Sequence, residues 1–165
     1  GIALVNPAAL PEVPLEPRLT AFIDGRSLQK MGDWEGIEKI DQELAAWPPG
    51  SLLYPEASRL RIAWRLTKHQ PDRAAEAFAL ADVLVARSPN LGDLLLRTDA
   101  AAQSGLNDHA WASLDRLRMR MGAGNQSPAI AQRALKLAAQ LEPFDGAQTT
   151  LRGLRTHASP RRKRN

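Results

Sequence analysis

The side chains that most often carry catalysis or bind metals are few in this chain and far apart. His69, His109 and His157 are its only histidines, and none belongs to an H-x-x-x-H or H-E-x-x-H pattern. The sequence contains no cysteine, which excludes thiolate nucleophiles, disulfides and cysteine-ligated metal sites. The G-x-S-x-G motif and the glycine–lysine phosphate loop are absent as well. We therefore predict no catalytic residues, no metal site and no cofactor.

Carboxylates and aromatic rings have structural explanations in this sequence. Asp33, Asp72 and Asp108 fall at predicted helix starts, where a carboxylate accepts hydrogen bonds from free backbone N–H groups, so we interpret them as N-caps. The tryptophans share helical stripes with leucine and isoleucine, which favours core packing over partner binding. They are Trp34, Trp47, Trp64 and Trp111.

Basic side chains are the remaining candidates for binding. Arg61, Arg65 and Lys68 follow one another at steps of four and three, and together with Arg97 they are our predicted contacts for a carboxylate-rich partner. The alternative is an ordinary solvated helix face. The C-terminus holds a denser cluster, suited to nucleic-acid phosphates or anionic lipid, or simply a soluble end. That cluster is Arg161, Arg162, Lys163 and Arg164.

The elements that must position these side chains are helices. Aromatic residues make up only 5% of the chain, while alanine and leucine are plentiful, and this balance favours helix over sheet. Apolar residues recur at steps of three and four between proline and glycine breaks. The predicted helices cover residues 18–31, 34–47, 53–69, 73–90, 91–104, 107 or 108 to 121, 128–141, and a last, weaker stretch ending near 156.

Three of these predictions specify a helix face. In the helix 73–90 the apolar residues recur at steps of three and four, so we expect them on one inner face: Ala74, Ala77, Phe78, Ala81, Leu84 and Val85. In the first helix, we expect Leu19, Phe22, Ile23 and Ser27 to share the inner face, with Leu28 and Met31 extending it. Gly25 is a weak point of that helix. In the helix 34–47 the polar face is predicted to be solvated. It comprises Glu35, Glu38, Lys39, Asp41, Gln42 and Glu43.

The chain divides into three predicted regions. Residues 1–17 form a proline-rich, extended lead-in. Its apolar start, Gly1–Val5, is compatible with the tail of a removed signal or anchor and equally with a plain extended end. Residues 18–156 form the helical domain, and residues 157–165 form a disordered basic tail. No stretch of the sequence approaches the roughly 20 apolar residues that span a bilayer.

The turns show a repeat. Short turns at 32–33, 71–72 and 107–108 recur roughly every 36 to 39 residues, which is typical of stacked helical hairpins. In the second helix of one unit, Ala77, Ala81, Leu84 and Pro89 resemble the tetratricopeptide repeat. Parts of the same spacing occur at Gly36, Ile40 and Pro48, and at Ala110, Leu114 and Gly122. The tryptophan–leucine–glycine–tyrosine pattern of the first helices is not recovered.

The resemblance implies an all-α fold of about four antiparallel hairpins, stacked as a right-handed superhelix whose first helices line a concave groove. We predict a non-catalytic protein–protein interaction module, an adaptor or assembly factor, favoured at the bacterial envelope over the cytoplasm. One alternative is a nucleic-acid-associated protein that uses the basic tail. The other is an accessory domain of a larger enzyme.

Overall fold

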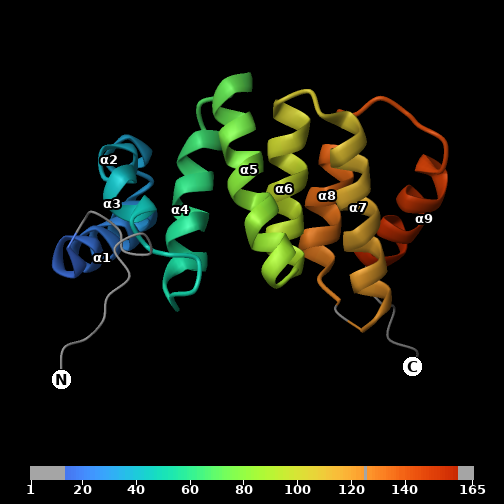
Figure 1. Ribbon diagram of the computed structural model, residues 1–165. Helices are drawn as coiled ribbons and strands as arrows, with labels where there is room; N and C mark the ends of the chain where they lie inside the picture. The colour runs from blue at the N-terminus through green and yellow to red at the C-terminus, as the bar shows by residue number, and fades with distance from the viewer. Residues whose placement is uncertain (1–13, 125, 160–165) are drawn as a thin grey trace. The chain divides into compact units, whose positions relative to one another are not determined.

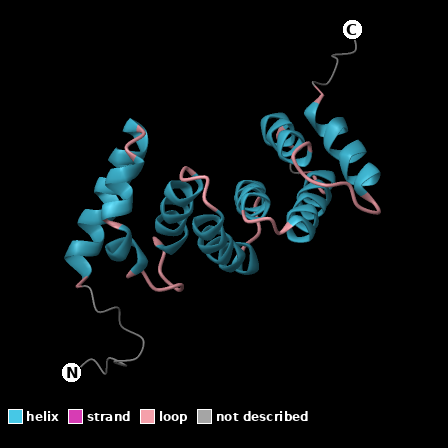
Figure 2. Ribbon diagram, turned by 90° about the horizontal axis from the view of Figure 1, so that it is seen from above, coloured by secondary structure: helices cyan, strands magenta, loops and turns pink. Residues whose placement is uncertain are grey.

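All regular elements of the described chain are α-helices. The computed structural model describes residues 14–124 and 126–159 (Figures 1 and 2). In these ranges the helices are α1 (Leu15–Met31), α2 (Trp34–Lys39), α3 (Asp41–Ala45), α4 (Tyr54–Leu66), α5 (Pro71–Arg87), α6 (Leu91–Gln103), α7 (Asn107–Gly122), α8 (Pro128–Ala138) and α9 (Ala147–Ala158). The predicted all-α class is confirmed.

The chain forms two compact units. Unit 1 is residues 1–68 and contains α1 to α4, and unit 2 is residues 69–165 and contains α5 to α9. The predicted lead-in falls largely on residues 1–13, and the basic cluster at 161–164 follows the last described residue, so both lie outside the described ranges.

In unit 1 the turn after α1 has the predicted form. Gly32 adopts a left-handed conformation with φ 69°, which glycine tolerates because it has no Cβ. The Asp33 carboxylate then accepts a 2.9 Å hydrogen bond from the Gly36 backbone N–H and caps α2. α1 accordingly packs back against α2, α3 and α4.

The inner face of α1 differs from the prediction. The helix begins at Leu15, three residues early, because Pro17 fits a first turn, where its missing N–H has no helical partner. Ala21 and Gly25 are its buried residues. Leu19 is 39% exposed, Ile23 is 62% exposed and Ser27 is exposed as well, so placing these three inside was wrong.

Close packing explains the rotation of α1. A Cβ on Gly25 would lie 3.0 Å from Leu60 Cδ1 of α4, closer than side chains normally pack. Gly25 is thus the residue that lets α1 approach α4, with Phe22 and Leu28 packed around the same core cluster. The same rotation leaves Met31, which we expected to extend the inner face, largely exposed.

The predicted helix 34–47 is two helices. The backbone departs from helical geometry at Ile40, with φ −104° and ψ 15°, between α2 and α3. Asp41 begins α3 and directs its carboxylate at α4, so its placement on a solvated face was also wrong.

In unit 2, helices that follow one another in the chain pack together, and so do some helices that are two positions apart in the chain. α5 packs on α6, α6 on α7 and α8 on α9, while α6 also contacts α8 and α7 contacts α9 (Figure 1). The predicted inner face of α5 is confirmed, because Ala74, Ala77, Ala81, Leu84 and Val85 are all buried.

Helix ends in unit 2 follow only part of the prediction. α8 begins at Pro128, the predicted start, and the Ser127 hydroxyl caps it by accepting a 3.4 Å hydrogen bond from the Ile130 N–H. Asp72 and Asp108, however, lie in the first turns of α5 and α7 rather than at the N-caps, which are Gln70 and Leu106. There a carboxylate stabilises the helix through the dipole.

The C-terminal helix is longer than predicted and packs tightly. α9 runs to Ala158, so His157 and Ala158 are helical rather than part of a tail. A Cβ at Gly153 would lie 2.6 Å from Arg118 Cγ of α7, so only glycine allows Arg118 to lie across α9.

Candidate partner-binding groove

Two arginines of α4, Arg61 and Arg65, bind the same carboxylate, that of Asp41. Arg65 donates to both oxygens of Asp41, at 2.7 and 3.0 Å, and Arg61 Nε donates to Oδ1 at 3.1 Å. The Trp64 indole N–H adds a further hydrogen bond of 2.9 Å to the same oxygen. Burial alone raises the pKa of Asp41, but the hydrogen bonds from Arg65, Arg61 and Trp64 outweigh it and lower the pKa to about 2.

The predicted basic contacts of this region, Arg61, Arg65 and Lys68, bind carboxylates of the chain itself. Arg61 and Arg65 are brought together by their spacing on α4, but their guanidinium groups bind Asp41, and Arg65 is buried. Lys68 forms an ion pair of 2.7 Å with Glu38. Each of these cations already has an internal acceptor, and a role for them in partner binding stays a prediction.

Arg97 is likewise enclosed, in unit 2. It is 9% exposed, donates to Asp82 at 3.0 Å and to the Ser113 hydroxyl, and lies 4.8 Å above the ring of Phe78. These contacts join α5, α6 and α7. The geometry makes Arg97 a link between helices, and its contact with a partner stays a prediction.

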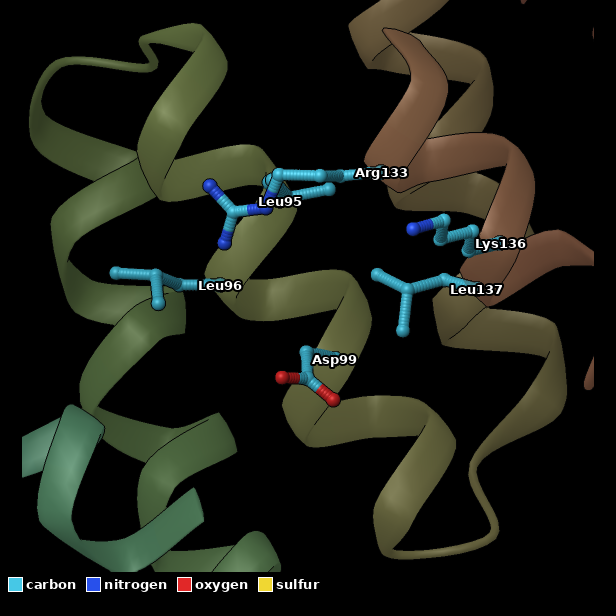
Figure 3. A pocket seen from close by; sticks show the side chains of 6 residues that line it. All are labelled: Leu95, Leu96, Asp99, Arg133, Lys136 and Leu137. Carbon is cyan, nitrogen blue, oxygen red and sulfur yellow. The ribbon is translucent and has the colours of Figure 1, made fainter. Parts of the chain in front are cut away.

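A groove between α6 and α8 contains cations that, unlike Arg65 and Arg97, are exposed. It has a volume of about 310 Å³, and Figure 3 shows side chains from both helices around it. α6 contributes Leu95, Leu96 and Asp99, and α8 contributes Arg133, Lys136 and Leu137.

The two walls of this groove differ in charge. Arg133 and Lys136 are exposed on α8, and neither has an ion-pair partner among the described residues. Asp99, on α6, accepts a 3.0 Å hydrogen bond from Gln103 of its own helix. Figure 3 shows Arg133 extending from α8 toward α6 above the leucine side chains. The groove therefore offers an apolar floor, a positive wall and a smaller negative one.

Helical spacing produces this arrangement. Arg133, Lys136 and Leu137 are three and four residues apart, so they share a face, while Ala131, Ala134 and Ala138 turn to the core. Sequence reasoning missed Arg133 and Lys136. A signal was present, because residues 128–138 contain two basic residues and no acidic one, so no carboxylate of the same helix can pair with them.

The remaining candidates from the sequence do not assemble into a site. Within residues 14–124 and 126–159, no group of three histidine, aspartate or glutamate side chains is placed to hold a metal ion. Trp47, Trp64 and Trp111 are buried and Trp34 is half-buried, as expected for core packing. In the same ranges no helix has both the length and the apolar character needed to cross a membrane.

In comparisons with known proteins, no family model, no curated protein and no solved structure matches this chain.

Proposed function

We propose that the chain is a non-catalytic protein–protein interaction module, an adaptor or assembly factor, that binds a segment of its partner between α6 and α8. The observation that carries this proposal is the pair of exposed cations, Arg133 and Lys136, beside an apolar floor. Exposed cations without an internal acceptor are available to a ligand at little desolvation cost.

The groove fits a segment that combines an apolar side chain with carboxylates. Leu95, Leu96 and Leu137 would receive the apolar side chain. Arg133 and Lys136 would bind carboxylates on the α8 side. Asp99 repels acidic groups from the α6 side, so it favours one orientation of the bound segment.

The packing of unit 2 supports a tetratricopeptide-like architecture. α6–α7 and α8–α9 are successive hairpins, their first helices touch each other, and so do their second helices. Under the proposed architecture the α6–α8 groove belongs to the first helices, which is the ligand-binding side that the resemblance implies. About four such hairpins, stacked in a right-handed superhelix, are part of the proposal.

The test is capture of partners by matched variants of the full chain. The groove variant is Arg133→Glu with Lys136→Glu, and the control is Arg152→Glu with Arg155→Glu. The control residues lie on α9 with the same spacing, and both are exposed. The native and control chains should retain a protein that the groove variant loses by at least about tenfold, since each reversal turns attraction into repulsion.

Fragments of the captured protein then identify the bound segment. The retained fragment should contain acidic residues next to an apolar one, and neutralising those acidic residues should restore binding to the groove variant in part. Equal retention by all three chains, or equal loss in the groove and control variants, would contradict the proposal. Dependence on nuclease treatment would point instead to nucleic acid.

A further inference from the structure

A second pocket of unit 2 lies between α7 and α9 and has a volume of about 480 Å³. It is separate in its residues from the α6–α8 groove. The lining residues are Asp108, Trp111, Ala112, Asp115, Phe144, Gly146, Thr149 and Thr150. We infer that this pocket binds an arginine side chain of a partner protein, whichever segment occupies the α6–α8 groove.

Two aromatic rings line the pocket, that of the buried Trp111 and that of the exposed Phe144. The rings of Trp111 and Phe144 lie 5.0 Å apart at 39° to each other. Trp111 is held in place by a 2.7 Å hydrogen bond from its indole N–H to the Glu142 carbonyl oxygen. Phe144, from the connection between α8 and α9, is 42% exposed. An exposed aromatic ring at the edge of a pocket is a surface on which a cation can stack.

The pocket also has a carboxylate without a described partner. Asp115 is occupied, because it accepts hydrogen bonds from Arg118 at 2.8 Å and from the Thr150 hydroxyl at 3.3 Å. Asp108 is exposed, and no hydrogen bond or ion pair joins its carboxylate to any residue in the described ranges. Its negative charge, together with the aromatic rings, favours a cationic ligand.

Elsewhere in this protein, an aromatic ring and an aspartate together bind an arginine at two places. An arginine guanidinium lies over an aromatic ring and simultaneously binds an aspartate, once in each unit. The sets are Arg65 with Trp64 and Asp41, at 4.4 Å from the ring, and Arg97 with Phe78 and Asp82, at 4.8 Å. The α7–α9 pocket has the ring and the aspartate, and no arginine of the described ranges lines it.

Arginine fits this combination better than lysine. The guanidinium is planar, so it stacks flat on a ring such as Phe144 while its edge N–H groups donate to a carboxylate such as Asp108. Lysine is a compact, strongly hydrated charge and makes no such flat contact. The hydroxyl of Thr149 at the rim offers a further acceptor.

The test uses N-acetyl-arginine N-methylamide as the probe and its citrulline analogue, which has the same shape without the charge. Both are titrated into the full isotope-labelled chain while the Trp111 indole and the Gly146 and Thr149 amide resonances are followed. We expect saturable shifts for the arginine probe with a dissociation constant on the order of 1–10 mM, and at least about fivefold weaker binding of the citrulline analogue.

Two variants and one matched control complete the test. Asp108→Asn should weaken probe binding about fivefold and Phe144→Leu about threefold, because each removes one contact of the guanidinium. Asp72→Asn is the control, since Asp72 is an exposed first-turn aspartate of α5, as Asp108 is of α7. It should leave probe binding unchanged.

Three results would overturn the inference. One is the absence of saturable shifts, and another is equal binding of the arginine and citrulline probes. The third is probe binding that becomes at least about fivefold tighter when residues 160–165 are deleted. That result would mean that an arginine of the chain itself, rather than of a partner, occupies the pocket.

Discussion

Two clusters in this protein each contain one aspartate and two basic residues, but the charged groups are paired in only one of them. In unit 1, Asp41 binds Arg61 and Arg65 directly, at 2.7 to 3.1 Å, between α3 and α4. In unit 2, Asp99 lines a groove with Arg133 and Lys136, and no ion pair joins these described residues. The closed cluster links helices of the fold, whereas the open one leaves its two cations without an ion-pair partner among the described residues.

The backbone decides between the two arrangements. Asp41 reaches α4 because the chain breaks at Ile40 and starts a new helix, which carries the carboxylate to the paired arginines. Asp99 lies within the regular helix α6. Its carboxylate accepts a hydrogen bond from Gln103, one turn further along the same helix. The basic residues of α8 therefore stay without an acidic partner across the groove.

The largest expected effect on stability comes from replacing each of the two aspartates in turn by alanine. Asp41→Ala leaves two enclosed guanidinium groups and the Trp64 N–H without their acceptor, and should lower the free energy of unfolding of unit 1 by about 3 kcal/mol. Asp99→Ala should change that of unit 2 by no more than about 0.5 kcal/mol. Denaturant unfolding followed by tryptophan fluorescence and circular dichroism measures both.

The fluorescence signal can be assigned to units. Trp34, Trp47 and Trp64 lie in unit 1, and Trp111 lies in unit 2. An Asp99→Ala chain as destabilised as the Asp41→Ala chain would abolish the distinction between the closed and the open cluster.

A smaller effect on the free energy of unfolding should appear at acidic pH. The pKa of Asp41 is about 2 in the folded chain against its ordinary 3.8, and a group whose folded pKa is depressed stabilises the fold above its unfolded pKa. This stabilisation, about 2 kcal/mol, should be complete above pH 4 and disappear as the pH falls from about 4 to 2.

The comparison of the native chain with Asp41→Asn isolates this contribution from that of the other carboxylates. Unfolding free energies measured between pH 2 and pH 7 should differ by a constant amount above pH 4 and converge below it. A difference that persists unchanged at pH 2 would show that the hydrogen bonds of Asp41 do not depend on its charge.

Sequence periodicity located most helices but not the faces of all of them. The α5 face was predictable because alanine, leucine and valine fall on one stripe between clear ends at Pro71 and Pro89. The α1 face was not, because the residues that pack there, Ala21 and Gly25, are small, and their packing depends on Leu60 of another helix. Apolar size alone indicated Leu19 and Ile23 instead.

The candidate site shows the same limit more strongly. Arg61, Arg65 and Arg97 stood out in the sequence because of their spacing or position, but whether a cation is paired depends on residues distant in the chain, such as Asp41 and Asp82. Tertiary ion pairs have no local signature. The pattern that did carry information was the absence of acidic residues in 128–138, around Arg133 and Lys136.

The smallest expected effect is that of salt, and it separates the two clusters by their exposure. The side chains of Asp41 and Arg65 are 16% and 8% exposed, so raising NaCl from 0.1 to 0.5 M should change the stability of unit 1 by less than about 0.5 kcal/mol. Arg133 and Lys136 are exposed, and screening should weaken their binding of an acidic segment about threefold over the same range. Parallel unfolding and partner-binding titrations measure the two responses. A binding affinity that is independent of salt would mean that the leucine floor, rather than the positive wall, recognises the partner.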